Sequence, residues 1–154
     1  MKHIAEVSAI KPMKIESLEQ LQVLVDAPLE CVFKLDGRPV SVTCRRVTQD
    51  VDEQVRALQR KAQPPYIKER NDYDNYNERY LFERDQNQKA ARSLLVYTGC
   101  PTIAAKKPGL TNAADIHRFV KTILTETILE LIALTIQAGG MELVERVNFT
   151  STAA

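Results

Sequence analysis

Residues 29–47 read Leu-Glu-Cys-Val-Phe-Lys-Leu-Asp-Gly-Arg-Pro-Val-Ser-Val-Thr-Cys-Arg-Arg-Val, and this stretch carries the clearest fold signal in the chain. Two runs of alternating apolar residues flank the pair Asp36-Gly37, which suits a two-residue type I′ turn because both positions of that turn need positive φ. Such a turn sets the pairing of the strands and places Leu29 opposite Cys44. One face of the hairpin is then apolar and the other mostly polar. The pattern predicts a β-hairpin lying on a hydrophobic core.

Helices are predicted on both sides of the hairpin. Residues 15–27 place apolar side chains at steps of three and four, and Pro28 stops this amphipathic pattern. After the hairpin, Asp50 and Glu53 have the spacing of a capping box and open a second apolar stripe. That stripe ends at Pro64-Pro65, the best candidate for a boundary within the chain.

The segment 66–92 is polar and holds four of the five tyrosines of the chain. Their intervals of seven, three and four residues are those of one helical stripe. The segment therefore predicts a polar, tyrosine-rich helix over residues 66–97, whose last two turns return to the core. The four tyrosines are Tyr66, Tyr73, Tyr76 and Tyr80.

The C-terminal region, residues 98–151, is predicted to be helical. Thr98-Gly-Cys-Pro101 is typical of a helix end followed by a new helix with proline in its first turn. Asn112 then opens the longest apolar-periodic stretch, residues 116–136, which is apolar over more than half of its circumference. Thr125 falls within this stretch and is able to cap a second segment, so the pattern allows one helix or two.

The elements together predict an α+β fold that is mainly helical, with an N-terminal hairpin at about 29–47 and a long C-terminal helical region. At the two ends of the chain, residues 1–13 predict a short edge strand or an arm, and residues 141–146 predict one or two further helical turns. We expect a single domain over residues 1–154. It comprises a region with the hairpin and its helices (residues 1–63), the polar tyrosine-rich helix (66–97) and the C-terminal helical region (98–151).

Composition argues against several classes of function. The chain of 154 residues has 21 Lys plus Arg against 20 Asp plus Glu, and this balance also holds locally. Because phosphate neutralisation supplies most of the non-specific affinity for nucleic acid, we expect no nucleic-acid partner. No apolar run approaches the roughly 18–20 residues that span a bilayer, so we expect no membrane partner. Glu6 interrupts the apolar core that a signal peptide requires, which predicts a cytoplasmic protein.

Residues for catalysis are scarce. The three cysteines, Cys31, Cys44 and Cys100, do not have the spacing of a zinc site or the even number of a disulfide scaffold. Cys31 and Cys44 are expected to be buried as small apolar residues, whereas Cys100 near a helix N-terminus is a candidate for a thiol of lowered pKa. His117 has no partner nucleophile or carboxylate in the sequence and is expected at the surface or its boundary. We therefore assign no catalytic residue, no cofactor and no metal ligand.

Two stretches are candidates for contact with partner proteins. Tyrosine covers a large contact area at low entropic cost, so the tyrosine-rich helix is a candidate surface, although its rings could equally pack this helix on its own domain. The apolar stretch 116–136 is either core or the contact of a homo-oligomer. The candidate contact residues are Tyr73, Tyr76, Tyr80, Phe82, Ile128, Leu131 and Ile132.

Over residues 29–151 the chain resembles the tail-assembly-chaperone proteins of tailed bacteriophages and prophages, most strongly after residue 94. The motifs that carry the resemblance are Val-Thr-Cys-Arg-Arg-Val-Thr (42–48), Leu-Leu-Val-Tyr-Thr-Gly-Cys-Pro (94–101), Lys-Lys-Pro-Gly-Leu (106–110), Ile-Leu-Thr-Glu-Thr-Ile-Leu-Glu-Leu-Ile (123–132) and Gly-Gly-Met-Glu-Leu-Val-Glu-Arg-Val-Asn-Phe-Thr-Ser (139–151).

The resemblance implies a protein without enzymatic activity. Such a chaperone binds the long helical tape-measure protein in the host cytoplasm, keeps it soluble and helps to recruit tail-tube protein around it. Many members are also made as a longer, frameshifted product. The family has no catalytic residues to transfer to this chain.

Two alternatives remain beside the chaperone. The first is a structural tail, neck or connector protein that is retained in the virion. The second is a small cysteine-dependent enzyme that uses Cys100, in which case a thiol reagent would label Cys100 faster than Cys31 or Cys44.

Overall fold

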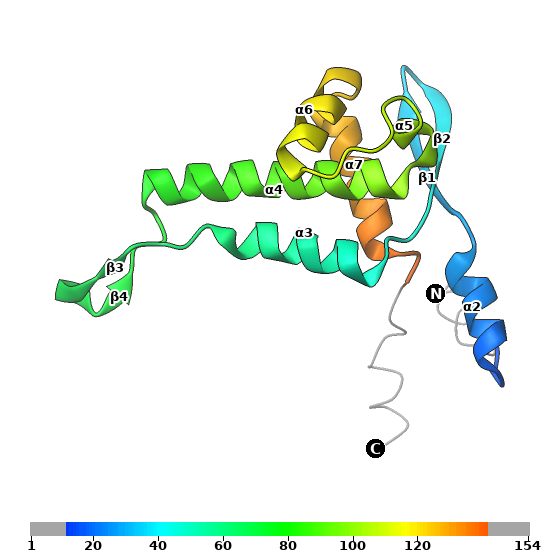
Figure 1. Ribbon diagram of the computed structural model, residues 1–154, viewed down its shortest axis with the longest axis horizontal. Coiled ribbons are helices and arrows are strands. Elements are labelled where there is room, and N and C mark those ends of the chain that lie inside the picture. Colours follow the sequence, from blue (N-terminus) through cyan, green and yellow to red (C-terminus); the bar gives the residue numbers. More distant parts are fainter. Residues whose placement is uncertain (1–11, 142–154) are drawn as a thin grey trace, which may run out of the picture.

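A computed structural model describes residues 12–141 and shows the predicted mainly helical α+β fold (Figure 1). The expected arm at residues 1–13 and the helical turns at 141–146 lie almost wholly outside the described residues. The elements are α2 (Leu18–Asp26), β1 (Leu29–Leu35), β2 (Arg38–Cys44), α3 (Gln49–Lys61), β3 (Tyr66–Ile67), the 3₁₀ turn η1 (Lys68–Arg70), β4 (Asp72–Tyr73), α4 (Glu78–Gly99), α5 (Pro101–Ala104), α6 (Ala113–Ile123) and α7 (Glu126–Ala138).

The β1–β2 hairpin has the predicted register. Leu29 pairs with Cys44, and both turn residues have positive φ, 51° at Asp36 and 77° at Gly37. The base of the apolar face is buried, but Phe33 is only half-buried and the residues near the turn are exposed. The base of the hairpin therefore packs on the core, and its tip extends beyond the core.

On the outer face of the hairpin, three polar side chains form a small cross-strand cluster. The Glu30 carboxylate on β1 accepts hydrogen bonds from the hydroxyls of Ser41 and Thr43 on β2, the latter at 2.9 Å. These two hydroxyls hold the pKa of the Glu30 carboxyl below its ordinary value. The polar residues of the alternating pattern in the hairpin thus face away from the core, as predicted.

The long helix α4 is the centre of the fold. α3 runs beside it, and α6 and α7 pack against its C-terminal half (Figure 1). That half carries most of the core residues of α4, whereas its N-terminal half is more exposed. The return of residues 90–97 to the core is thus confirmed. The residues of α4 that are buried are Ala91, Ser93, Leu94, Leu95, Val96, Tyr97 and Gly99.

The hairpin, α4 and α7 meet at the C-terminal end of α4. The amide of Arg45, just after β2, donates a hydrogen bond of 2.7 Å to the carbonyl of Gly99. A Cβ atom at Gly99 would lie only 2.5 Å from Cδ1 of Ile136 on α7 and 3.1 Å from the Arg45 carbonyl oxygen. Next to this contact, the Sγ atoms of the fully buried Cys44 and Cys100 are 3.8 Å apart. Glycine fits here because any side chain would crowd the Ile136 side chain and the Arg45 carbonyl.

The helix ends confirm most of the predicted signals and correct one. Asn112 caps α6, and Gly139 ends α7 in the left-handed conformation at φ 62°. At α3, however, the N-cap is Thr48, whose hydroxyl accepts from the amide of Val51 at 3.4 Å, and the capping box predicted at Asp50 does not form.

The prediction of one helix over residues 66–97 is wrong for its first third. Residues 66–73 form the short β3–β4 hairpin, and α4 begins only at Glu78. Asp72 and Asp74 accept hydrogen bonds from nearby amides, those of Tyr73 and Tyr76, at 2.7 and 3.1 Å. Such local bonds compete with helix formation. Asn71 adds a left-handed residue at φ 49° that turns the chain.

The apolar stretch 116–136 forms two helices rather than one. α6 ends at Ile123, and Leu124 and Thr125 have extended backbones before α7 begins. Thr125 takes the N-cap position of α7, although its hydroxyl makes no capping hydrogen bond. This break lets both helices lie against α4.

The close approach at Gly99 predicts the effect of a small substitution. We expect Gly99→Ala to lower the free energy of unfolding by about 1–3 kcal/mol, because the new methyl group overpacks a core in which Ile136 is buried. Urea unfolding monitored by circular dichroism measures the change. Removal of the opposing methyl in Gly99→Ala/Ile136→Val should recover some of the loss. A Gly99→Ala variant as stable as the parent or more stable, the direction that helix propensity alone favours, would contradict the contact.

Candidate interaction surfaces

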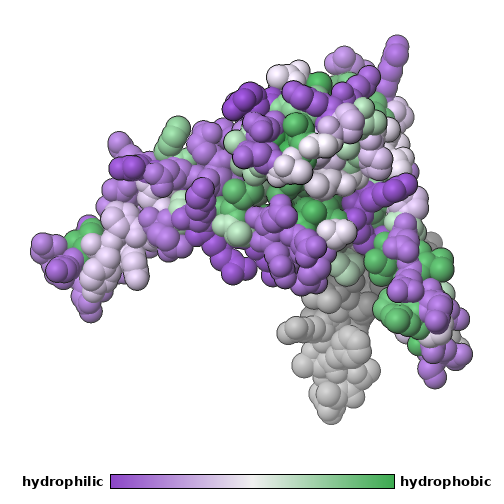
Figure 2. All heavy atoms as spheres, viewed as in Figure 1, coloured by the Kyte–Doolittle hydropathy of each residue, from purple (hydrophilic) through white to green (hydrophobic). Residues whose placement is uncertain are grey.

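Helix α2 presents an apolar surface that the described residues of the chain leave uncovered. None of its residues is buried, and it stands apart from the α3–α4 layer in Figure 1. In Figure 2, hydrophobic side chains gather on this helix at the lower right of the view. We call these residues the α2 stripe. It comprises Ile15, Leu18, Leu21, Leu24 and Val25, each between 38% and 66% exposed.

Side-chain hydrogen bonds cap both ends of α2. The hydroxyl of Ser17 caps its N-terminus by accepting from the amide of Gln20 at 3.3 Å. At its C-terminus, Nη1 of Arg46 donates to the carbonyls of Leu24, Val25 and Ala27 at 3.2, 2.8 and 2.9 Å. A cation that binds the last carbonyls of a helix also interacts favourably with the helix dipole.

The same guanidinium joins α2 to the core. Nε of Arg46 donates at 2.7 Å to the carbonyl of Gly139, the residue that ends α7. Beside this contact, a groove of about 580 Å³ runs between the end of α2 and the segment that follows β2. Its lining includes Val25, Asp26, Arg45 and Val47. Arg46 therefore positions α2 at a distance from the core instead of packing it on the core.

The α2 stripe is absent from the contact residues predicted from sequence. Its spacing predicts an amphipathic helix, but such a pattern is normally explained by packing on the core. One signal in the sequence does indicate that α2 is not packed on the core, because the neighbouring segment offers little apolar surface to cover the helix. The outer face of the following hairpin is mostly polar, so this hairpin does not supply a second apolar surface on which α2 could pack.

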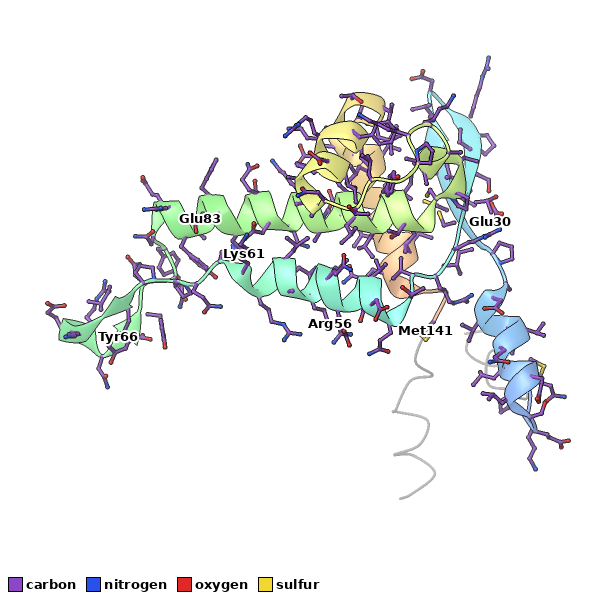
Figure 3. The ribbon with its side chains drawn as sticks, viewed as in Figure 1. Glu30, Arg56, Lys61, Tyr66, Glu83 and Met141 are labelled. Carbon is purple, nitrogen blue, oxygen red and sulfur yellow. The ribbon has the colours of Figure 1, made fainter. Side chains whose placement is uncertain are left out.

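Three of the four predicted tyrosines are exposed, and the four do not form one surface. Tyr66 and Tyr73 stack edge to face at 5.3 Å in the β3–β4 hairpin, at the opposite end of the molecule from α2 (Figures 1 and 3). Tyr76, at 88% exposed, lies between this hairpin and α4. Tyr80 is half-buried on α4 beneath the Arg84 guanidinium, 5.6 Å from the ring centroid. The predicted single stripe is therefore wrong, because the helix does not extend over the first three tyrosines.

The other predicted contact residues divide between surface and core. Phe82 on α4 is 65% exposed and remains available to a partner. On α7, Leu131 is 39% exposed and Ile128 is half-buried against the core. Ile132 is 1% exposed and packs in the core, so this residue is not accessible for partner contact.

The three cysteines are buried and unpaired by disulfides, as predicted for Cys31 and Cys44. Burial raises the pKa of the Cys100 thiol, and the neighbouring Cys44 raises it further. The position at the start of α5 therefore does not give Cys100 a lowered pKa. A nucleophilic thiolate requires the opposite environment.

A crevice of about 330 Å³ lies between α4, α6 and α7 and contains His117. Nδ1 of His117 is 2.6 Å from the hydroxyl of the buried Ser93. Burial lowers the pKa of His117, and the nearby Lys121 and Lys89 lower it further. Lys89 itself pairs with Glu126 at 3.4 Å. His117 thus lies at the boundary of the core, and its hydrogen-bond partner is a buried serine rather than a carboxylate.

Within residues 12–141, no group of three or more histidine, cysteine or carboxylate side chains is placed to hold a metal ion. Over the same range of the chain, no helix has the length and apolar character needed to cross a membrane. No protein-family profile, curated protein or solved structure matches this chain.

The role of Arg46 in positioning α2 predicts a local loss of structure. We expect Arg46→Ala to increase amide hydrogen exchange in residues 18–27 by at least about tenfold, because the C-terminal carbonyls of α2 lose a charged donor worth roughly 1.5–3 kcal/mol. Hydrogen exchange followed by mass spectrometry measures this. Arg45→Ala is the matched control, since Arg45 contacts Gly99 through its backbone. Equal exchange in both variants would show that Arg46 does not hold the helix.

The burial of the cysteines predicts slow chemical modification. We expect a maleimide reagent to label Cys31, Cys44 and Cys100 at least about a hundredfold more slowly in the folded protein than in urea, because reaction requires an exposed thiolate. Peptide mapping gives the rate at each site. Fast labelling of Cys100 in the folded chain would contradict its burial and favour the hypothesis of a cysteine-dependent enzyme.

Proposed function

We propose that this protein is a non-enzymatic tail assembly chaperone of a tailed bacteriophage or prophage, which binds the tape-measure protein in the host cytoplasm and assists assembly of the tail tube. The observation that carries the proposal is the α2 stripe, an apolar helix face on which every residue remains at least 38% exposed. The sequence motifs after residue 94 that resemble this family support it independently.

An exposed apolar helix is suited to the work of such a chaperone. A long helical client exposes apolar stripes before it is enclosed by the tube, and a second helix covers such a stripe by matching its spacing. Covering a fully exposed leucine or valine gains roughly 1.5–3 kcal/mol. The α2 stripe has only five partly exposed residues, and association itself costs free energy. The expected complex is therefore reversible, as release of the chaperone from the finished tail requires.

The geometry also fits a protein with two separate contact regions. The α2 stripe lies at one end of the molecule, and the exposed pair Tyr66 and Tyr73 lies at the other (Figure 1). Under the proposal, α2 binds the tape-measure protein and the tyrosine-bearing hairpin contacts the tail-tube protein. The separation would allow one chaperone to contact both proteins together.

A capture experiment tests the assignment of α2. The tagged full-length chain is recovered from cells in which the phage is assembling, and bound proteins are quantified by mass spectrometry. We expect the parent chain to capture the tape-measure protein and Leu18→Ala/Leu21→Ala/Val25→Ala to capture at least about tenfold less, since three stripe side chains are truncated. Alanine favours the helix, so the fold of α2 is retained. Val32→Ala/Leu35→Ala, which truncates exposed residues of the hairpin, is the matched control.

Purified particles provide the second measurement. A chaperone should be absent from finished virions or far below one copy per structural subunit. Stoichiometric presence of the chain, together with capture of tube or neck proteins instead of the tape-measure protein, would overturn the proposal and identify a structural virion protein.

A further inference from the structure

One edge of the β1–β2 hairpin is blocked. A two-residue turn hydrogen-bonds its flanking residues, here Leu35 and Arg38, and bonded pairs then alternate along the antiparallel ladder. Every second residue therefore directs its backbone N–H and C=O away from the partner strand. On β2 these residues include Pro39, which has no N–H, and just beyond the strand the amide of Arg45 already donates to Gly99. The edge of β2 is thus blocked near both of its ends.

The edge of β1 carries no such block. Its outward backbone groups belong to Glu30, Val32 and Lys34, and within residues 12–141 none of these groups is hydrogen-bonded to another element. All three side chains are exposed, Val32 to 68%. Figure 3 shows Glu30 on the side of the hairpin that is turned away from α4. An unpaired strand edge is a template for the addition of a further strand.

The sequence of β1 is complementary to a second copy of itself. When two β1 edges pair antiparallel with Val32 opposite its own counterpart, Glu30 of each chain lies opposite Lys34 of the other. Opposite charges at such cross-strand positions are stabilising. On the other face, this register pairs only apolar residues, Leu29 with Leu35 and Cys31 with Phe33.

The charged groups are available for these pairs. The ion pairs formed among residues 12–141 do not include Lys34. The Glu30 carboxylate accepts from the hydroxyls of Ser41 and Thr43 within its own chain. A carboxylate has about four lone-pair sites, so it is able to accept from a lysine of the second copy as well.

The exposed tip of the hairpin gives a second reason for pairing. Leu35 lies on the apolar face but is 49% exposed, because the tip extends beyond the core of its own chain. In the antiparallel pair, this tip lies beside Leu29 of the second copy, at the base of a hairpin that packs on a core. Two blocked β2 strands then form the outer edges of the sheet, so that assembly closes at two chains.

We infer that the β1 edge is a self-association surface through which two copies of this chain form a continuous four-stranded antiparallel sheet. The surface is distinct from the α2 stripe, and the inference goes beyond the proposed function. Each chain of the pair retains its own α2, so binding of a client by α2 does not require the dimer.

Sedimentation velocity of the full-length chain tests the contact. We expect the parent chain to form a reversible dimer with a dissociation constant of micromolar order, because a single strand pair is a small interface. Lys34→Glu places two carboxylates opposite each other at both ends of the contact. It should raise the dissociation constant at least about fivefold at low salt. Lys68→Glu, the same charge change on the exposed turn between β3 and β4, is the matched control and should leave it unchanged.

A mixture of two variants identifies the register. Glu30→Lys places two ammonium groups opposite each other and should also weaken the dimer. When Glu30→Lys and Lys34→Glu chains are mixed in equal amounts, every cross-strand charge pair between them is again of opposite sign. The mixture should associate at least about fivefold more tightly than either variant alone. Circular dichroism checks that each variant is folded.

Amide hydrogen exchange of the parent chain, measured by nuclear magnetic resonance, locates the contact without a substitution. Exchange at Glu30, Val32 and Lys34 should slow severalfold as the protein concentration passes through the dissociation constant, whereas exchange at Ser41 and Thr43 on the β2 edge should not change.

Four results would overturn the inference. They are a parent chain that stays monomeric at about 0.5 mM, a dimer that Lys34→Glu leaves equally tight, a mixture without rescue, and a dimer that Leu18→Ala/Leu21→Ala/Val25→Ala dissociates instead. If the parent chain is monomeric and the β1 amides are protected only when a captured tail protein is added, the edge belongs to that protein and not to a second copy.

Discussion

The close approach of the β1–β2 hairpin, α4 and α7 at Gly99 is the constraint on which the fold depends. The hydrogen bond between the Arg45 amide and the Gly99 carbonyl fixes the end of the hairpin to the end of α4. The missing side chain at Gly99 admits Ile136, so α7 crosses at the same point. Elements distant in sequence thus converge within a few ångströms, and Cys44 and Cys100 are sealed beside them.

Arg46 connects the contact at Gly99 to the exposed helix α2. Arg46 follows Arg45 in sequence, and its guanidinium binds the last carbonyls of α2 and the carbonyl that ends α7. The Arg46 side chain therefore links α2 to the end of α7, although α2 has no buried residue of its own. One Arg-Arg pair thus has two roles: the first residue closes the core through its backbone, and the second presents the α2 stripe through its side chain.

Local chemistry makes most of the core predictable. The Asp36-Gly37 turn determines the register of the hairpin, and the apolar spacing of residues 90–97 identifies the buried half of α4. The helix predicted over the tyrosine segment is wrong at its start. Side-chain spacing alone does not reveal that the carboxylates of Asp72 and Asp74 accept hydrogen bonds from nearby backbone amides and so compete with the helix. The spacing of the α2 stripe predicts a helix face but not its exposure, since exposure depends on what the rest of the chain brings to that face. A one-dimensional pattern does not contain this information.

The length of α2 connects its exposure to partner binding. A helix of nine residues is too short to be stable alone in water, because nucleation is costly and few hydrogen bonds follow it. The caps at Ser17 and Arg46 offset some of that cost, while no residue of the stripe is buried in the described structure. A helical partner that covers the stripe therefore adds the packing energy that a core normally supplies. Under the proposed function, binding of such a partner and ordering of α2 are coupled, which keeps the expected affinity moderate and the complex reversible.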